Sequence, residues 1–417
     1  MAVGVNWSNN NLAMTNYVRD IVETLNYSSN PRRLISQNKD GRGSHFEGRL
    51  HEFGNHGIAG VGDLGAFPAA GNQGYLTWKA YRKGTVAAVQ VSDFALYGVA
   101  GNNSFKSVYE SETKGVMRDV MLFESGMFYG DGTGEVALVK ENASGGSDTS
   151  LIVDDSRMMW KNASFQVYPD SGFSAGTSTS RGTVTVSART EAPTTDGYAT
   201  VTLSSAMPSA VVSGDHVVWN NTYMLAKSGL NLLVDNTLST NFQNIDVSSA
   251  THYTSYVDGN GGTERPFSPN LFRKTLAAVK SKCGNDTPAE GLDVLCSNWG
   301  SVEVEELFEG DLRLSPTDTV GGLAIASFQS TLGKINVITD ALCPYRQMFF
   351  IDPSKIFRGV IRELDWRRGD GNLPILMPSQ TSGVNLGTLL EICEYYITER
   401  NTSARIDDID VTIATMF

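Results

Sequence analysis

Cysteine is scarce in this sequence. The 417 residues include four, none of them in a CxxC pair: Cys283, Cys296, Cys343 and Cys393. Structural zinc sites need paired spacings, and disulfide-stabilised secreted domains need a far higher cysteine density, so neither class of protein fits. We therefore expect buried free thiols, which suit a reducing cytoplasm.

Long apolar runs are also missing. No segment approaches the roughly 20 residues that a helix needs to span a bilayer. A secretory signal begins with a basic region that is followed by an apolar core, and residues 1–7 do not show this pattern. The sequence therefore predicts no membrane span, no signal peptide and no membrane partner.

Charge is low and its sign is unbalanced. Charged residues make up 19% of the chain, and 33 Lys and Arg face 45 Asp and Glu, for a net charge of −12. A protein that grips nucleic acid needs a concentrated basic face, because phosphate neutralisation supplies most of the non-specific affinity. The densest basic segments, 79–83 and 367–368, are short. We expect this chain to surround DNA rather than to bind it tightly or sequence-specifically.

Catalytic and metal-binding motifs are equally scarce. The phosphate-binding loop GxxxxGK[ST] is absent. Residues 172–176 match the GxSxG nucleophile elbow around Ser174, but the sequence lacks the strand before it and the helix after it. Three of the five histidines lie within residues 36–75, at spacings that do not match a helical metal pair. We predict no enzyme activity, no catalytic residue, no cofactor and no metal site.

The N-terminal quarter reads as an arm followed by a long extension. Residues 1–35 are polar and contain one short amphipathic piece, whereas ten glycines fall between positions 41 and 74. With a strand-like run at 85–92, residues 36–95 predict a two-stranded extension with no core of its own. An isolated hairpin is marginally stable, so a neighbouring subunit is expected to bury its aromatic roots. The predicted subunit contacts are Tyr75, Trp78, Lys79, Tyr81, Arg82 and Lys83.

The rest of the chain predicts an α+β fold with an all-β insert. A helix is expected over 104–128 and another from Ser268-Pro269 to Gly284. Between them, six strand-like runs separated by turn clusters indicate a small antiparallel barrel or sandwich. These runs are 135–139, 150–153, 164–168, 182–187, 199–204 and 215–219. Strands at 292–296, 323–328, 335–340 and 347–351 and a helix near 299–308 follow, and 389–398 is strand or helix.

An ordered set of short motifs spans residues 53–134. It consists of GVGDLGAFP at 60–68, GNQGY at 71–75, WKAYRKGTV at 78–86, QVSD at 90–93 and, after the long helix, GDGTG at 130–134. In this order the motifs resemble the major capsid proteins of tailed bacteriophages, which have the Hong Kong 97-type fold. No single motif is diagnostic; the order carries the resemblance.

The resemblance implies a domain plan. It comprises an N-terminal arm (1–35), an extended loop that lies over the adjacent subunit (36–95), a peripheral domain with a spine helix (96–135) and its return (226–268), a β-rich insertion domain (136–225), an axial domain (269–375) and a C-terminal segment returning to the core (376–417).

The resemblance also implies a function. The chain would self-assemble as hexamers and pentamers into an icosahedral shell around double-stranded DNA. It would assemble in the bacterial host cytoplasm, reside in the virion, and have a separate scaffold, a portal and decoration proteins as partners. Because the predicted arm is short, the scaffold is expected to be a separate chain, or this chain to be already trimmed.

Three alternatives remain open at this point. An encapsulin-like nanocompartment shell would share the fold but package protein cargo. A phage tail protein or adhesin would fit the β-rich insert alone and would form trimers or fibres. An enzyme would rest only on the isolated Ser174 motif.

Overall fold

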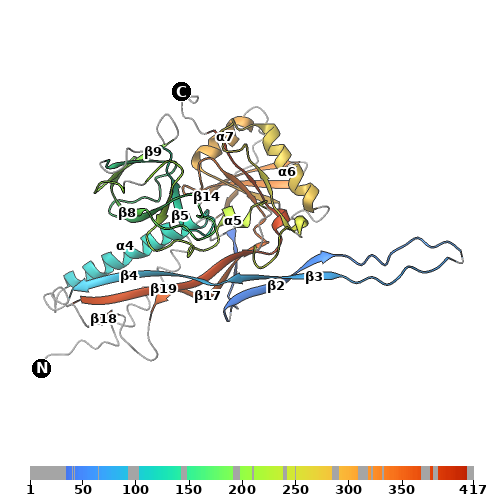
Figure 1. Cartoon of the computed structure of the whole chain (residues 1–417), viewed down its shortest axis with the longest axis horizontal. Helices are drawn as coiled ribbons and strands as arrows, with labels where there is room; N and C mark the ends of the chain where they lie inside the picture. Colours follow the sequence, from blue (N-terminus) through green and yellow to red (C-terminus); the bar gives the residue numbers. More distant parts are fainter. Residues whose placement is uncertain are drawn as a thin grey trace.

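In the computed structural model, two compact lobes stand on one side of a long layer of strands (Figure 1). The predicted arm 1–35 lies almost wholly outside the residues that the structure describes. Those residues are 34–39, 41, 43–63, 65–92, 103–141, 148–190, 198–208, 211–237, 242–248, 250–283, 291–308, 318–320, 323–330, 333–367, 376–378 and 384–410.

The strand layer is a five-stranded sheet built on the long strand β19 (Val384–Ile397). One edge of β19 pairs with β17 (Ile356–Trp366) and β18 (Leu376–Pro378), and the other edge pairs with β4 (Lys83–Ser92), all antiparallel. β1 (Ser36–Asn38) joins β17 in parallel. The segment 389–398, which the sequence left open between strand and helix, is therefore strand, because it has hydrogen-bonded partners on both edges.

A two-stranded hairpin, β2 (His45–Phe53) and β3 (Gly74–Tyr81), projects from one end of this layer (Figure 1). The predicted extension is present, but its strands differ from the expectation. Residues 85–92 belong to β4 in the five-stranded sheet. The partner of β3 is β2, a strand that the sequence did not predict. β2 contains a single glycine, Gly48, so the glycine-rich character of the region lies mainly beyond the strands.

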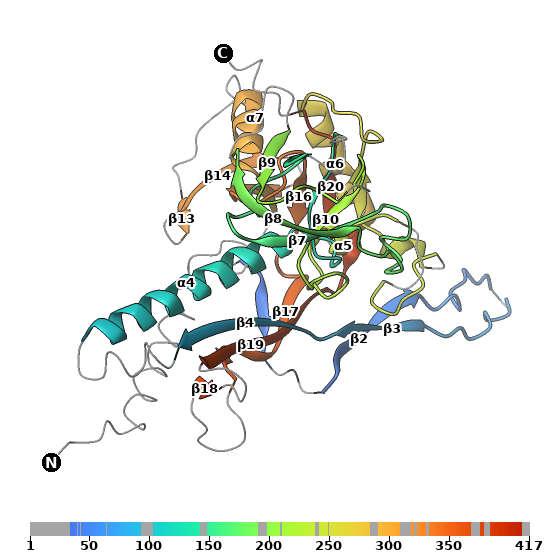
Figure 2. The ribbon, with the colours of Figure 1, turned by 60° about the vertical axis from the view of Figure 1, so that its left-hand side comes forward.

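The predicted long helix is confirmed as α4 (Asn103–Met127). Both ribbon views show it lying along β4, beneath the first lobe (Figures 1 and 2). At its end, Gly126 lies against the lobe so closely that an added Cβ would be 2.3 Å from the sulfur of Met158. Gly132 and Gly134 then take positive φ (+88° each), which the turn after the helix requires of residues without a side chain.

The first lobe is a six-stranded antiparallel barrel. Its strands are β5 (Glu135–Leu138), β6 (Ser150–Val153), β7 (Ser164–Tyr168), β8 (Gly182–Arg189), β9 (Ala199–Leu203) and β10 (His216–Trp219). They are ordered β5-β10-β7-β8-β9-β6, and a bridge between Val139 and Val153 closes the ring. All six predicted runs are confirmed as strands. Inward-facing side chains such as Leu151, Phe165 and Val201 are fully buried and form a core of the barrel's own.

The second lobe contains a seven-stranded mixed sheet in the order β11-β20-β16-β12-β15-β14-β13. These strands are β11 (Tyr256–Asp258), β20 (Ala404–Ile406), β16 (Met348–Ile351), β12 (Leu292–Cys296), β15 (Gly333–Thr339), β14 (Leu323–Ser330) and β13 (Asp318–Val320). Helices α6 (Pro269–Cys283) and α7 (Asn298–Phe308) belong to the same lobe. The predicted cap of α6 is confirmed, since the Leu271 N–H donates to the Ser268 hydroxyl at 3.2 Å.

Residue alternation along β12 and β16 divides the interior of the second lobe into two cores. Val294 and Phe350 pack with Phe272 of α6, whereas Leu295 and Phe349 point into a central core. That central core also holds the residues just after α4, the root of the hairpin, and residues of two short helices, α5 (Leu230–Leu233) and Thr251–Tyr253. A third short helix, Arg400–Thr402, follows β19. The hairpin is thus rooted at the point where the sheets meet.

The thiol prediction is confirmed. All four cysteines are free; three are buried, and Cys283 is half-buried. Burial raises the pKa of the Cys393 thiol to about 11, so this thiol is un-ionised at neutral pH. Among the helices that the structure describes, none is long and apolar enough to cross a membrane.

Candidate functional site: the hairpin, its anchorage and a groove

Strand alternation gives the hairpin two unlike faces. On the face turned toward the body, Phe46 and Trp78 are 8% and 6% exposed. On the opposite face, Tyr75 and Tyr81 are 56% and 58% exposed, with Lys79 between them. The structure therefore separates the predicted contact residues into a buried set and an exposed set.

The exposed face carries aromatic rings in cross-strand pairs. Tyr81 lies opposite His45 with ring centroids 5.6 Å apart, and Tyr75 lies opposite His51 at 5.4 Å. Aromatic residues are enriched in the buried centres of protein interfaces. This face therefore has the composition of a surface that another protein covers.

Beyond the paired strands, the tip of the hairpin at 54–73 is unusually apolar for an exposed segment. Ile58 is 86% exposed and Phe67 is 90% exposed. Six of the eleven exposed large hydrophobic residues in the described part of the chain lie on this hairpin: Phe53, Ile58, Val61, Phe67, Tyr75 and Tyr81. Such a concentration on a projection without a core indicates a contact with another molecule.

An aromatic stack fixes the root of the hairpin to the body. The Tyr396 ring on β19 lies 5.0 Å from the Trp78 ring, 5.6 Å from Phe46 and 5.5 Å from Phe357. The Asn38 side-chain amide donates to the Tyr396 hydroxyl at 3.1 Å. Trp78 is therefore an anchor inside its own chain, and its role as a subunit contact stays a prediction.

Two glycines permit this stack. A Cβ added at Gly48 would lie 2.5 Å from the Trp78 ring, and one added at Gly359 would lie 2.6 Å from the Phe46 ring. Both distances are far below van der Waals contact, so neither position can take a side chain without moving the aromatic ring.

The three basic residues of the predicted contact set have different surroundings. Lys79 forms a long ion pair with Glu47, at 4.0 Å, and Arg82 is exposed and donates to the Gly43 carbonyl at 3.0 Å. The Lys83 ammonium instead points inward and donates to the Ala226 carbonyl. Tyr75, Lys79, Tyr81 and Arg82 remain as proposed subunit contacts.

Next to the root, a cluster of buried charges joins four segments. The Lys227 ammonium lies 2.7 Å from a Glu124 oxygen and 2.5 Å from a Glu391 oxygen. Arg358 pairs with the other oxygen of Glu391 and with Glu363 at 3.0 Å. The side chains of Lys227, Glu124, Arg358 and Glu391 are at most 3% exposed. Removing one member of such a cluster is strongly destabilising, because it leaves a buried charge unpaired. The cluster therefore holds α4 against β17 and β19.

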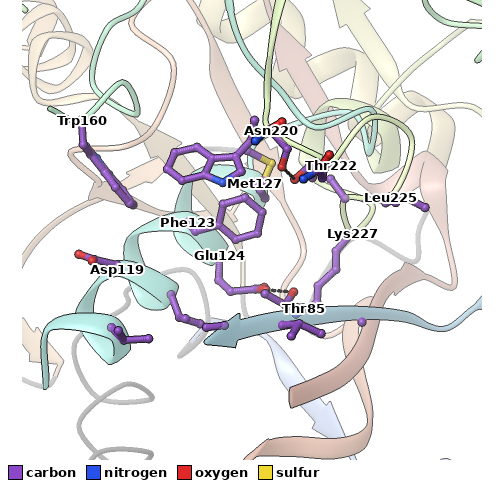
Figure 3. A pocket seen from close by; sticks show the side chains of 18 residues that line it. Thr85, Asp119, Phe123, Glu124, Met127, Trp160, Asn220, Thr222, Leu225 and Lys227 are labelled. Carbon is purple, nitrogen blue, oxygen red and sulfur yellow. Dashed lines mark hydrogen bonds and ion pairs between the residues drawn. The ribbon is translucent and has the colours of Figure 1, made fainter. Parts of the chain in front are cut away.

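A groove of about 540 Å³ opens between α4, β4 and the barrel (Figure 3). Three of its lining side chains are aromatic and contact one another: the Phe123 ring of α4 lies 5.5 Å from the Trp219 ring, which lies 5.0 Å from the Trp160 ring. At its margin, Val86 and Leu225 are 62% and 65% exposed. Sequence patterns did not predict the groove, because its outermost wall segments are more than 130 residues apart in the chain.

The sequence and the fold of this chain are both similar to those of known proteins. The family profile described as SU10 major capsid protein matches residues 178–368. The structure also aligns with the capsid asymmetric unit of cyanophage A-1(L), with a TM-score of 0.50 and 10% sequence identity, over 93% of this chain and 92% of that one. Residues 178–368 are thus similar to a family of major capsid proteins, and the chain as a whole has the fold of a phage capsid subunit. The predicted Hong Kong 97-type α+β fold is confirmed.

Other solved structures are similar to this chain at lower scores. The capsid of the native GTA particle aligns with a TM-score of 0.49 and 7% identity, covering 92% of this chain and 90% of that one. The holo-SrpI encapsulin of Synechococcus elongatus aligns with a TM-score of 0.43 and 9% identity, covering 92% and 90%. No curated protein sequence matches the chain.

The serine motif lies on a turn of the barrel. Ser174 is exposed between β7 and β8, and the turn leads into a strand and not into the helix that a nucleophile elbow needs. The neighbouring Phe173 is buried and stacks on His216, with ring centroids 3.9 Å apart. Within the described residues, no group of three His, Cys, Asp or Glu side chains could hold a metal ion.

His216 sits between two carboxylates. Its Nδ1 lies 3.0 Å from Glu135 and its Nε2 lies 3.3 Å from Asp170. Burial of the ring opposes protonation, but the two carboxylates outweigh it and raise the pKa of His216. The histidine thereby ties the turn at 170–176 to strand β5.

Proposed function

We propose that this chain is the major capsid protein of a tailed phage, that it joins its copies through the β2–β3 hairpin, and that it assembles as hexamers and pentamers into an icosahedral shell around double-stranded DNA. One observation carries the proposal: apolar side chains are concentrated on a projection that has no core but a rigid root. Burying that surface needs a second molecule, and in a shell the second molecule is another copy. Each contact can be modest, because every subunit makes many.

The charge of the chain supports enclosure of DNA rather than tight binding. The net charge of −12 repels phosphate, and the short basic segments give no continuous face for it. The free thiols suit assembly in the reducing cytoplasm of a bacterial host, followed by residence in the virion. A separate scaffold, a portal and decoration proteins complete the set of proposed partners.

The seven-part domain plan is retained as a proposal. The separate core of the barrel supports treating 136–225 as a distinct unit. The core of the second lobe supports an axial unit, but one that also takes in β11 and β20, while β17 at 356–366 belongs to the strand layer. The hairpin falls within the proposed extended loop and α4 within the proposed peripheral domain.

Electron microscopy of the protein expressed alone, before and after nuclease digestion, tests the proposal. Closed polyhedral particles, or rings of five and six subunits, are the expected result. Uniform trimers or fibres in both samples would contradict it, and so would uniform monomers that persist when the protein is co-expressed with the phage's scaffold. Particles that contain protein cargo and no nuclease-protected DNA after expression with the phage's packaging proteins would identify a nanocompartment instead.

A matched variant isolates the role of the hairpin tip. Phe53 and Gly74 already face each other across the two strands, so an Asn-Gly turn can replace residues 54–73 and close the hairpin. This variant should fold, because Phe46 and Trp78 remain in place, and should fail to close shells. Normal particles from it would contradict the assignment of the hairpin as the joining element.

A further inference from the structure

The groove between α4, β4 and the barrel has an aromatic end. Phe123, Trp160 and Trp219 line it, and each of the three is half-buried. The Phe123 and Trp219 rings meet at an angle of 64°, and the Trp219 and Trp160 rings meet at 68°. Neighbouring rings are therefore closer to perpendicular than to parallel. Walls that face in different directions suit a compact group that several rings surround, rather than a flat group that stacks on one ring.

One carboxylate lies at the same end of the groove. Asp119 is exposed and lines the groove from α4, one helical turn before Phe123. Figure 3 shows its side chain on the Trp160 side of the groove. The other charged groups of the lining, Lys227 and Glu124, pair with each other at 2.7 Å. Along the stretches of chain that the structure describes, Asp119 has no cationic partner, so its charge is open to an occupant.

Rings and carboxylate together select a cation. The face of an aromatic ring attracts a positive charge within about 6 Å, and tryptophan does so best. An anion would be repelled by Asp119 and by the net charge of −12. An uncharged apolar occupant would gain from the rings and nothing from the carboxylate. The groove volume of about 540 Å³ lies in the range of small-molecule sites.

The opposite rim of the groove is fixed in place. Met224 has a φ of +60°, which is uncommon for a residue other than glycine. Its N–H donates to the Thr133 carbonyl at 2.8 Å, and the next N–H, that of Leu225, donates to the Thr222 carbonyl at 2.8 Å. Backbone in this region persists where its surroundings determine it, and it is often found at binding sites. Leu225 is thus held at the margin before any ligand arrives.

We propose that this groove binds a small organic ammonium ion. Trp160 and Phe123 supply ring faces to the cationic head, Asp119 supplies the counter-charge, and Leu225 contacts the aliphatic part. Trp160 and Trp219 both come from the barrel, so the β-rich insertion completes the site. This binding is independent of the proposed shell function, because one copy of the chain supplies every group.

A pair of probes with the same shape tests the preference for a cation. Choline and 3,3-dimethyl-1-butanol differ in charge and hardly in size. Each is titrated into the full-length protein while indole fluorescence is followed. Choline should bind about three- to thirty-fold more tightly than the alcohol, the range of a cation on aromatic rings. Equal affinities, or no saturable binding of choline, would overturn the site.

A matched pair of carboxylate variants tests the location. Asp119→Asn should weaken choline binding about threefold or more. Asp63→Asn removes the same charge from an exposed position on the hairpin tip and should leave binding unchanged. Both positions are exposed, so both variants should fold. Equal weakening in the two would show attraction to the overall negative charge and no site in the groove.

A pair of tryptophan variants tests the rings. Trp160→Leu should lose most of the preference for choline over the alcohol, whereas Trp160→Phe keeps an aromatic face and should retain part of it; Trp219 still reports binding in both. A full preference in Trp160→Leu would contradict the role of the ring, and Asp119→Asn decides the case if Trp160→Leu does not fold. Shells that form from a chain without choline binding would overturn the site and leave the proposed function standing.

Discussion

Replacing Trp78 with alanine should detach the hairpin from the body without unfolding the barrel. The indole is 6% exposed and lies 5.0 Å from the Tyr396 ring, with the backbone of Gly48 against its other side. Strand backbone cannot collapse into the space left behind, so the cost should reach the range for buried Trp truncation, about 3–5 kcal/mol. Tyr75→Ala, on the exposed face of the same strand, should cost less than about 0.5 kcal/mol.

Amide hydrogen exchange measures this difference where it arises. The Lys79 amide donates to the Gln243 carbonyl at 2.7 Å and reports whether the root of the hairpin is closed. With every 1.4 kcal/mol equal to a factor of ten, Trp78→Ala should accelerate its exchange by roughly 10² to 10³ or more. Tyr75→Ala should leave exchange unchanged while it weakens assembly. Equal protection of Lys79 in Trp78→Ala and the wild type would refute the anchor.

Three further predictions concern stability. Lys227→Met should lower the free energy of unfolding by about 3–5 kcal/mol, because it leaves buried carboxylates unpaired. Lys274→Met removes an exposed partner of Asp258 and should lower it by less than about 1 kcal/mol. Urea unfolding midpoints of the two variants measure this difference. Gly48→Ala should loosen the hairpin root, since its Cβ would lie 2.5 Å from the indole, and faster exchange of the β2 amides would show it. The raised pKa of His216 adds stability that is fully present below about pH 6.5 and is lost as pH rises through the folded-state value. His216→Gln should remove this pH dependence of thermal unfolding between pH 5 and 8; an unchanged profile would rule out His216 as its source.

Local patterns predicted most of the elements of this fold. All six barrel strands were found because each is a short run of strand-forming residues between turn clusters, a signal contained within four to eight residues. The cap at Ser268 and the apolar stripe of α6 are similarly local. The extension was also expected, because glycine density and aromatic roots without a core are visible in sequence alone.

Long-range pairing set the limit of prediction. β17 was missed because Arg358, Arg362 and Glu363 interrupt an otherwise apolar run, and their burial makes sense only beside Glu391 on β19. Trp78 was assigned to a neighbour because nothing near it in sequence reveals Tyr396 as its partner. The groove likewise exists only where α4, β4 and the barrel meet.

A reconstruction of the assembled particle by electron cryomicroscopy tests the central claim most directly. The account predicts a closed shell in which the hairpin of each subunit extends over an adjacent subunit, with density for Phe67 against that neighbour. Hairpins that point into solvent, or that fold back on their own subunit in a closed shell, would contradict it.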